Sequence, residues 1–133
     1  MRFVLDASVT IVWAMRDEAH ILADRAFLEL KSGSAIVPAI WWYEIRNILV
    51  LNERRGRITQ EDCTQFIHAL QQFKIEISFP HDGAETMELS RKHRLSVYDA
   101  AYLALALREG LPLATLNKVL GEAATEEGIR SLA

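Results

Sequence analysis

The chain has 133 residues, 50% of them hydrophobic and 25% charged, which is typical of a globular protein and excludes a disordered or fibrous one. Its formal net charge of −3 argues against coating of nucleic acid through an overall basic field, although clustered acids could lower the sum while basic residues gather elsewhere. No run of about 18 apolar residues suggests a membrane span, and the single cysteine, Cys63, is typical of a reducing compartment. We therefore expect one cytoplasmic domain over residues 1–133 that does not associate with membranes.

Short apolar runs alternate along the chain with longer amphipathic segments. The first half predicts, in order, a strand at 2–5, a helix at 7–15, a helix at 20–31, a strand at 35–37 and a long helix at 39–55. The second half predicts a helix from the N-cap Thr59 to about 73, a strand at 76–79, a helix at 82–94, a helix at 96–109, a strand at 111–115 and a short fifth strand at 129–132.

Strands separated by helices pair in parallel through right-handed crossovers. We therefore expect an α/β fold of three layers, in which helices flank a central, mainly parallel sheet of four to five strands. Ligands of such sheets bind outside the carboxyl ends of the strands. This rule directs attention to Asp6, to the region of Pro38 and to Leu116–Asn117.

Two acids stand at positions where a structural and a functional role are both open. Asp6 ends an apolar strand before a helix, so it is either an N-cap or a carboxylate that projects into the crevice of the sheet. Asp99 is the one charged residue within Val97–Leu107, a helix that should be interior because it is apolar on all sides. Its structural alternative is a capping box with Ser96, for which Glu or Gln is the usual partner.

Glu44 lies among apolar neighbours in the long predicted helix. On a helix of 3.6 residues per turn, four apolar residues lie within about a sixth of a turn on either side of it: Ile40, Trp41, Ile48 and Leu51. A buried carboxylate costs several kcal/mol unless it is paired or binds a cation. Glu44 is therefore predicted either to pair with a basic side chain or reach water, or to bind a metal ion.

The α/β topology can bring one strand end and two helix ends to the same crevice, so we expect Asp6, Glu44 and Asp99 to form one site. Hard oxygen ligands without a nearby cysteine or a paired histidine indicate Mg²⁺ or Mn²⁺ rather than zinc. The histidines show no zinc-like spacing and are expected to be ordinary: His20, His68, His81 and His93.

Four segments carry a resemblance to a known family. The opening Val4–Ser8 (VLDAS) is similar to the start of PIN-domain nucleases, especially the toxin ribonucleases of VapBC-type toxin–antitoxin pairs. Glu44 within Trp42–Asn47 (WYEIRN) resembles the glutamate in the middle of that family's chains. Ser96–Ala106 (SVYDAAYLALA) resembles its most recognisable stretch, and Pro112–Lys118 (PLATLNK) its final block, so the resemblance spans the whole chain.

The resemblance implies a metal-dependent endoribonuclease that hydrolyses RNA phosphodiester bonds and acts as the toxin of a toxin–antitoxin pair. Asp6, Glu44 and Asp99 would bind one or two Mg²⁺ or Mn²⁺ ions, and Ser8 and Thr115 would orient the carboxylates through hydrogen bonds. The resemblance also implies an antitoxin as partner and, commonly, a homodimer. The long helix fits a partner, because Trp42, Ile45 and Leu49 make it apolar on a second side, although deep burial explains the same pattern.

Asn117 departs from the family pattern, in which an aspartate usually stands at this position. Asparagine keeps an oxygen that could reach a metal directly or through water, but it lacks the charge. The alternative function is therefore a catalytically weak or inactive PIN-like domain that binds RNA or an antitoxin.

Two basic clusters are candidates for RNA contacts: Arg54, Arg55 and Arg57, and Arg91, Lys92 and Arg94. Basic residues are also favoured at helix C-termini by the helix dipole, which is the structural explanation of both clusters.

Two other classes of protein fit less well. A receiver-type signalling domain needs an adjacent pair of acids after its first strand, and here Ala7 follows Asp6. An Asp-x-Asp phosphatase needs a second aspartate where Ser8 stands.

Overall fold

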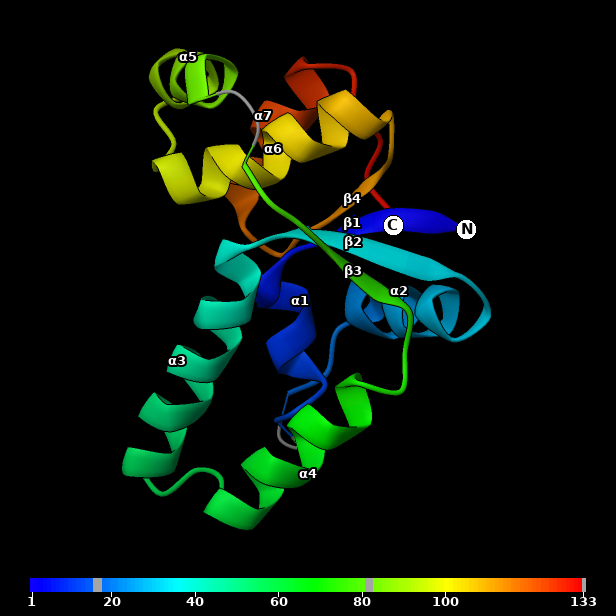
Figure 1. The fold of residues 1–133 in the computed structure, drawn as a ribbon, viewed down its shortest axis with the longest axis vertical. Helices are drawn as coiled ribbons and strands as arrows, with labels where there is room; N and C mark the ends of the chain where they lie inside the picture. Colours follow the sequence, from blue (N-terminus) through cyan, green and yellow to red (C-terminus); the bar gives the residue numbers. More distant parts are fainter. Residues whose placement is uncertain (16–17, 81–82, 133) are drawn as a thin grey trace.

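In the residues that the computed structural model describes (1–15, 18–80 and 83–132), a parallel sheet of four strands forms the centre of the protein (Figure 1). Its order is β3-β2-β1-β4, with the strands β1 (Arg2–Leu5), β2 (Ser34–Pro38), β3 (Ile75–Ser78) and β4 (Leu113–Ala114). The central strand β1 places Phe3 opposite Ala35 of β2 and Val4 opposite Leu113 of β4. The predicted fifth strand at 129–132 is a single bridge between Ser131 and Leu113.

Helices cover both faces of the sheet, which confirms the predicted three-layer α/β fold (Figure 1). One layer contains α5 (Gly83–His93), α6 (Val97–Glu109) and α7 (Lys118–Glu126). The other face carries α1 (Ala7–Val12) and α2 (Ile21–Ser32), and beyond them α3 (Ile40–Arg54) and α4 (Gln60–Leu70) extend away from the sheet. Thr59 caps α4, as its sequence predicts.

The observed helices differ from the predicted ones at two places. α1 ends at Val12, and the predicted continuation to Met15 consists of turns. α7 is not predicted, although Asn117 accepts a hydrogen bond from Leu120 N as its N-cap and Leu120, Ala123 and Ala124 are its buried residues. The short length of this helix and its glycine, Gly121, obscure the pattern. The predicted start of the helix at 82–94 lies outside the described residues.

α6 is the central helix of its layer, as its apolar sequence predicts. Tyr102, Leu103 and Ala106 are 0% exposed, and the helix ends at Gly110, whose positive φ of 64° favours glycine. The middle of this helix is buried and therefore held rigidly by packing. The polar side chains in its first turns are therefore attached to a rigid part of the fold.

The buried face of α3 differs from the predicted one. Its buried residues are Trp41, Ile45, Leu49 and Asn52. Leu51, predicted to share an apolar stripe with Glu44, is 36% exposed, and Glu44 lies at the edge of the buried face rather than in its middle. The reason is that apolar residues cover most of this helix, so periodicity could not show which side meets the core.

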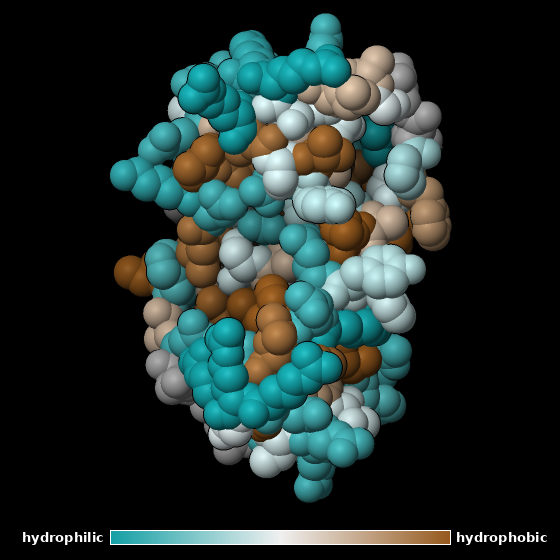
Figure 2. All heavy atoms as spheres, turned by 90° about the vertical axis from the view of Figure 1, so that its left-hand side faces the viewer, coloured by the Kyte–Doolittle hydropathy of each residue, from teal (hydrophilic) through white to brown (hydrophobic). Residues whose placement is uncertain are grey.

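Large hydrophobic side chains remain exposed on the face that carries α3, α5 and the start of α6. Figure 2 shows brown and pale side chains gathered around the middle of this face, with teal side chains above and below. A groove of about 550 Å³ opens between these elements, and its mostly apolar lining includes Ile40, Tyr43, Phe79 and Met87. An exposed apolar surface of this kind marks a site of interaction.

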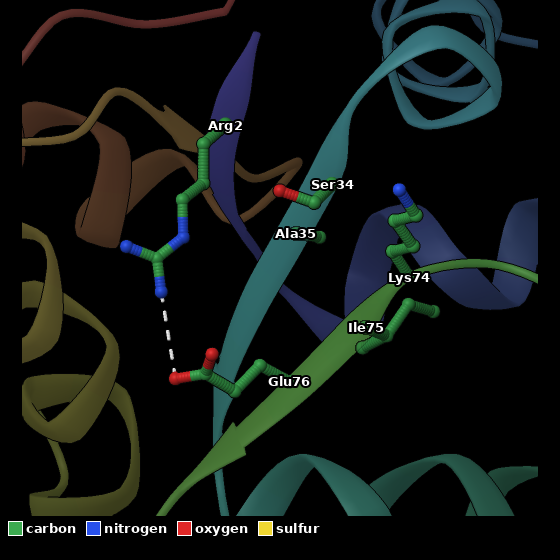
Figure 3. A pocket seen from close by; sticks show the side chains of 6 residues that line it. All are labelled: Arg2, Ser34, Ala35, Lys74, Ile75 and Glu76. Carbon is green, nitrogen blue, oxygen red and sulfur yellow. Dashed lines mark hydrogen bonds and ion pairs between the residues drawn. The ribbon is translucent and has the colours of Figure 1, made fainter.

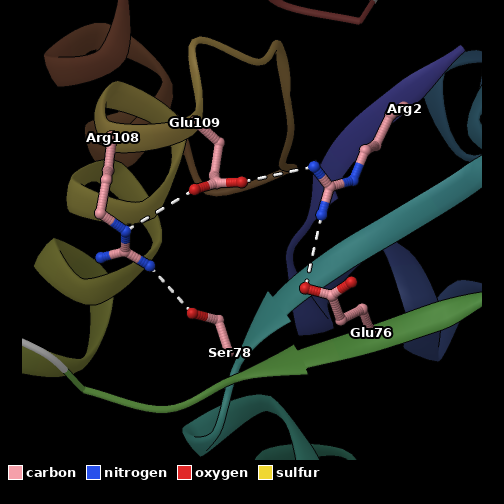
Figure 4. Close-up of polar contacts among 5 residues, drawn as sticks. All are labelled: Arg2, Glu76, Ser78, Arg108 and Glu109. Carbon is pink, nitrogen blue, oxygen red and sulfur yellow. Dashed lines mark hydrogen bonds and ion pairs between the residues drawn. The ribbon is translucent and has the colours of Figure 1, made fainter.

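The Arg2 side chain links β1 to β3 and α6 near the amino ends of the strands. A shallow cavity of about 310 Å³ lies there, with Arg2, Lys74 and Glu76 in its lining (Figure 3). The Arg2 guanidinium donates to Glu76 of β3 at 3.4 Å and to Glu109 of α6 at 3.3 Å, and Arg108 donates to Ser78 at 2.9 Å (Figure 4). These exposed contacts connect the layers, and each contributes about 0–1 kcal/mol.

No helix within the described residues combines the length and the apolar character that crossing a membrane requires.

Candidate metal centre

The carboxyl ends of the central strands lie near the starts of α3 and α6, the helices that carry two of the predicted acids (Figure 1). Asp6 directly follows β1, and Thr115–Asn117 follow the neighbouring strand β4. Glu44 lies near the start of α3, the helix that follows β2, and Asp99 lies in the first turn of α6. Hydrogen bonds join these elements: Thr115 donates to Asp6, Asn117 donates to Asp99, and Tyr102 of α6 donates to Glu44 of α3.

Asp6 is buried, with 5% of its surface exposed, and it does not act as a side-chain N-cap for α1. Instead its Oδ2 atom accepts hydrogen bonds from Ser8 Oγ and Thr115 Oγ1, both at 2.7 Å. Ser8 Oγ in turn accepts from Leu116 N at 2.9 Å, and Thr115 Oγ1 accepts from Asn117 N at 3.0 Å. The two hydroxyl groups are thus held by backbone amides and orient the carboxylate.

Glu44 contacts a residue that the sequence analysis missed. Its Oε1 atom accepts a hydrogen bond of 2.6 Å from the hydroxyl of Tyr102, which is fully buried in α6. Among the described residues no arginine or lysine is ion-paired with Glu44, so the salt-bridge explanation does not hold. A signal was present in the sequence, because a tyrosine within an otherwise apolar helix needs a partner for its hydroxyl group.

Asp99 and Asn117 contact each other. The backbone N–H of Asp99 donates to the N-cap Ser96, but the Asp99 carboxylate accepts from Asn117 Nδ2 at 3.2 Å instead of completing a capping box. The other end of the Asn117 amide, Oδ1, accepts from Leu120 N at 3.2 Å and caps α7. Both ends of the amide are therefore engaged, with its nitrogen toward Asp99.

Burial has the largest effect on the pKa values of Asp6 and Glu44, followed by hydrogen bonds and then by repulsion between the acids. Burial raises the pKa of Asp6, hydrogen bonds from Thr115 and Ser8 lower it, and the charge of Asp99 raises it further. Burial likewise raises the pKa of Glu44; the hydrogen bond from Tyr102 opposes this, and the charges of Asp6 and Asp99 add to it. Burial, together with the charge of Asp6 and contact with Glu44, raises the pKa of Tyr102, which keeps its hydroxyl a donor.

The chemistry of this donor set fits a hard divalent cation, because it offers carboxylate oxygens without thiols or imidazoles. Within the described ranges, however, no three Asp, Glu, His or Cys side chains form a ready-made group for one ion. Each carboxylate instead accepts a hydrogen bond from a neutral donor.

The predicted basic clusters lie at the ends of helices. Arg54 and Arg55 are exposed where α3 ends, and Arg57 donates to Asn52 at 2.9 Å. Arg91 is exposed in the last turn of α5, and Arg94 follows that helix with a positive φ of 55°.

Two other basic side chains, Lys92 and Lys118, differ in their surroundings. Lys92, also in the last turn of α5, is ion-paired with Glu127 at 2.7 Å. Lys118, which the sequence analysis did not single out, is exposed at the start of α7 directly after Asn117.

Comparison with known proteins places these features in a family. Residues 3–126 match the model of the PIN domain. The chain is 32% identical over 126 residues to Ribonuclease VapC3 of Pyrobaculum aerophilum, covering 92% of this chain and 94% of that protein. Its fold is similar to the crystal structure of PAE2754 from Pyrobaculum aerophilum, with a TM-score of 0.76 at 19% identity over 99% of this chain and 90% of that one. PIN-domain VapC nucleases generally depend on a divalent metal. Because the PIN-domain model matches nearly the whole chain, the chain belongs to the PIN-domain family.

Proposed function

We propose that the protein is a metal-dependent endoribonuclease that hydrolyses RNA phosphodiester bonds and acts as the toxin of a toxin–antitoxin pair. One observation carries the proposal: Asp6, Glu44 and Asp99 lie near the carboxyl edge of a PIN-domain sheet, and within the described residues their carboxylates accept hydrogen bonds from neutral side chains only. The name of the relative, Ribonuclease VapC3, supports RNA as substrate and favours a nuclease over an inactive binding module.

In the proposed mechanism Asp6, Glu44 and Asp99 would hold one or two Mg²⁺ or Mn²⁺ ions. Such ions, when bound, lower the pKa of water and stabilise the leaving oxygen of a phosphodiester. Ser8 and Thr115 hold the Asp6 carboxylate in one orientation through their 2.7 Å hydrogen bonds. Asn117 is not proposed as a direct ligand, because its amide oxygen caps α7.

Basic side chains near the site would bind the phosphates on either side of the cleaved bond. Lys118 has the best position, because it is exposed directly after Asn117. Arg91 and Arg94 lie close in sequence to Ser96, the N-cap of α6, and remain candidates. Arg54 and Arg55 lie about 15 Å along α3 from Glu44 and would contact only more distant nucleotides.

Removal of divalent metal is the direct test of the proposed activity. The purified protein should cleave single-stranded RNA in millimolar Mg²⁺ or Mn²⁺, and excess EDTA should abolish cleavage because the carboxylates alone cannot activate water. Added Mg²⁺ should restore it. Cleavage that persists in EDTA would contradict the proposed chemistry, and a lack of binding to either ion at millimolar concentration would favour the inactive binding module.

We also propose an antitoxin as partner, bound to the exposed apolar side of α3. Trp42 and Val50 are each 41% exposed there, although other residues of the same helix pack into the core. A short neighbouring gene for a DNA-binding protein that blocks RNA cleavage would support this pairing. RNA and antitoxin would meet the protein in the cytoplasm, which is its proposed location.

A homodimer is proposed through the groove between α3, α5 and α6. Phe79 and Met87, which line it, are 69% and 46% exposed, and burial of such side chains favours association.

Phe79→Glu should convert the dimer to a monomer in sedimentation experiments, because a charge would be buried. Ile21→Glu is the control, since Ile21 on α2 is 86% exposed and not in the groove. A wild-type monomer, or a dimer unaffected by Phe79→Glu, would contradict this interface.

A further inference from the structure

Each acid of the candidate metal centre has one oxygen held by a neutral donor from another part of the chain. Tyr102 donates to Glu44 Oε1, Asn117 donates to Asp99 Oδ2, and Ser8 and Thr115 donate to Asp6 Oδ2. Within the described ranges, the other oxygens of Glu44 and Asp99 (Oε2 and Oδ1) accept no hydrogen bond. One oxygen of each of these two acids is thus engaged and the other is left for a ligand.

On the basis of the proposed function, we propose that Tyr102 and Asn117 are positioning residues of the candidate metal centre. These two residues hold Glu44 and Asp99 so that each carboxylate presents a single oxygen to the ion. Neither residue would touch the ion or the RNA. Their contribution would be to fix the carboxylates before the ion binds and to favour ions that accept one oxygen from each acid.

Tyr102 is suited to this role by its rigidity. Its side chain is fully buried in α6, so packing fixes the position of the hydroxyl, which lies 2.6 Å from Glu44 Oε1. Glu44 is a longer, half-buried side chain, and ordering a glutamate side chain costs conformational entropy. The hydrogen bond would reduce this cost at the moment of metal binding, and it connects α6 to α3 across 58 residues of sequence.

The amide of Asn117 has only one orientation that satisfies both of its contacts. Its oxygen accepts from Leu120 N, and its nitrogen donates to Asp99 Oδ2. Rotation of the amide by half a turn would place oxygen against carboxylate and nitrogen against an N–H group, and both contacts would be repulsive. Asparagine therefore gives Asp99 a donor that an aspartate at position 117 would lack.

Neutral donors have an advantage over basic ones at these positions. A lysine or arginine beside Glu44 or Asp99 would neutralise the carboxylate and compete with the metal ion. A hydroxyl or amide group orients the carboxylate and leaves its charge. Single oxygens suit the octahedral, partly hydrated coordination of Mg²⁺, whereas Ca²⁺ accepts more oxygens and often both from one carboxylate. The proposed arrangement therefore predicts a preference for Mg²⁺ over Ca²⁺.

The test is calorimetric titration of Mg²⁺ and Ca²⁺ into Tyr102→Phe and Asn117→Ser. Tyr102→Phe removes one hydroxyl group, and serine keeps an N-cap for α7 but cannot reach Asp99 as a donor. We expect each variant to bind Mg²⁺ about 10–100-fold more weakly, with a smaller loss for Ca²⁺. Tyr98→Phe is the matched control on the same helix, because Tyr98 is 60% exposed, and it should leave both affinities unchanged.

The change in Mg²⁺/Ca²⁺ preference distinguishes a positioning role from a general loss of stability. A general loss of stability would weaken the binding of both ions alike. Thermal melting in EDTA identifies a variant that fails to fold; if Tyr102→Phe fails, Asn117→Ser decides alone. Wild-type affinity and preference in a folded variant would overturn the role of the residue replaced. RNA cleavage by wild type with unchanged metal binding in both variants would overturn this inference alone, whereas a wild type that binds no Mg²⁺ would overturn the proposed function as well.

Discussion

Asp6→Asn and Asp99→Asn are each expected to lower the rate of RNA cleavage by more than about 100-fold while the protein stays folded. Residues that only orient a metal ligand change affinity or activity by about 10–100-fold, and loss of a ligand's charge should cost more. Asparagine keeps the shape of the side chain and an oxygen that can accept the bonds from Ser8 and Thr115. The measurement is initial cleavage rate at saturating Mg²⁺ with one defined RNA.

Stability provides an independent signature of the same site. Because burial raises the pKa of Asp6, its ionised carboxylate destabilises the metal-free fold near neutral pH, where it is charged. Asp6→Asn should therefore increase the free energy of unfolding in EDTA by about 0.5–2 kcal/mol. Asp24→Asn, an exposed change on α2, should alter neither cleavage nor stability. Undiminished cleavage by both site variants would show that these acids do not hold the metal.

Ile45→Ala should lower the free energy of unfolding by about 2–5 kcal/mol. Ile45 is 0% exposed on the core side of α3, and its truncation leaves a cavity between this helix and the rest of the protein. Since domains have only about 5–15 kcal/mol of stability, this is a large share. The measurement is denaturant unfolding, in which the midpoint should fall without a change in slope.

Leu51→Ala is the matched control, because it removes a similar side chain from the same helix. Leu51 is 36% exposed, so its truncation should cost less than about 1 kcal/mol. Equal losses for the two variants, or a larger loss for Leu51→Ala, would show that the sequence-based assignment of the buried stripe was right and that α3 packs differently.

Glu44 shows how an expectation can rest on a partly wrong argument. Its sequence neighbours predict a carboxylate in the middle of an apolar stripe, whereas the core side of α3 is formed by Trp41, Ile45 and Leu49. Glu44 lies at the edge of that side, half-buried, where it meets Tyr102 and remains open to a ligand. An apolar pattern shows that a helix has a buried side, but only packing selects which side is buried.

Asn117 shows the opposite case, in which a recognised residue has an unexpected contact. Its departure from the family pattern suggests a lost ligand. In the structure its oxygen caps α7, a helix that the sequence analysis missed, and its nitrogen donates to Asp99. The same amide group caps α7 and donates to Asp99. Because the sequence analysis did not predict α7, it could assign neither role to Asn117.

The sequence by itself determined the alternation of strands and helices, the parallel α/β class and the three acids, since periodicity, capping and turn signals act over a few neighbouring residues. Only the tertiary structure decided which donor holds each acid. Those hydrogen bonds join residues 18, 58 and 109 positions apart. Such contacts depend on how helices pack across the sheet, which no local pattern specifies. The candidate metal centre therefore combines carboxylates that the sequence predicts with hydrogen-bond donors that only the fold identifies.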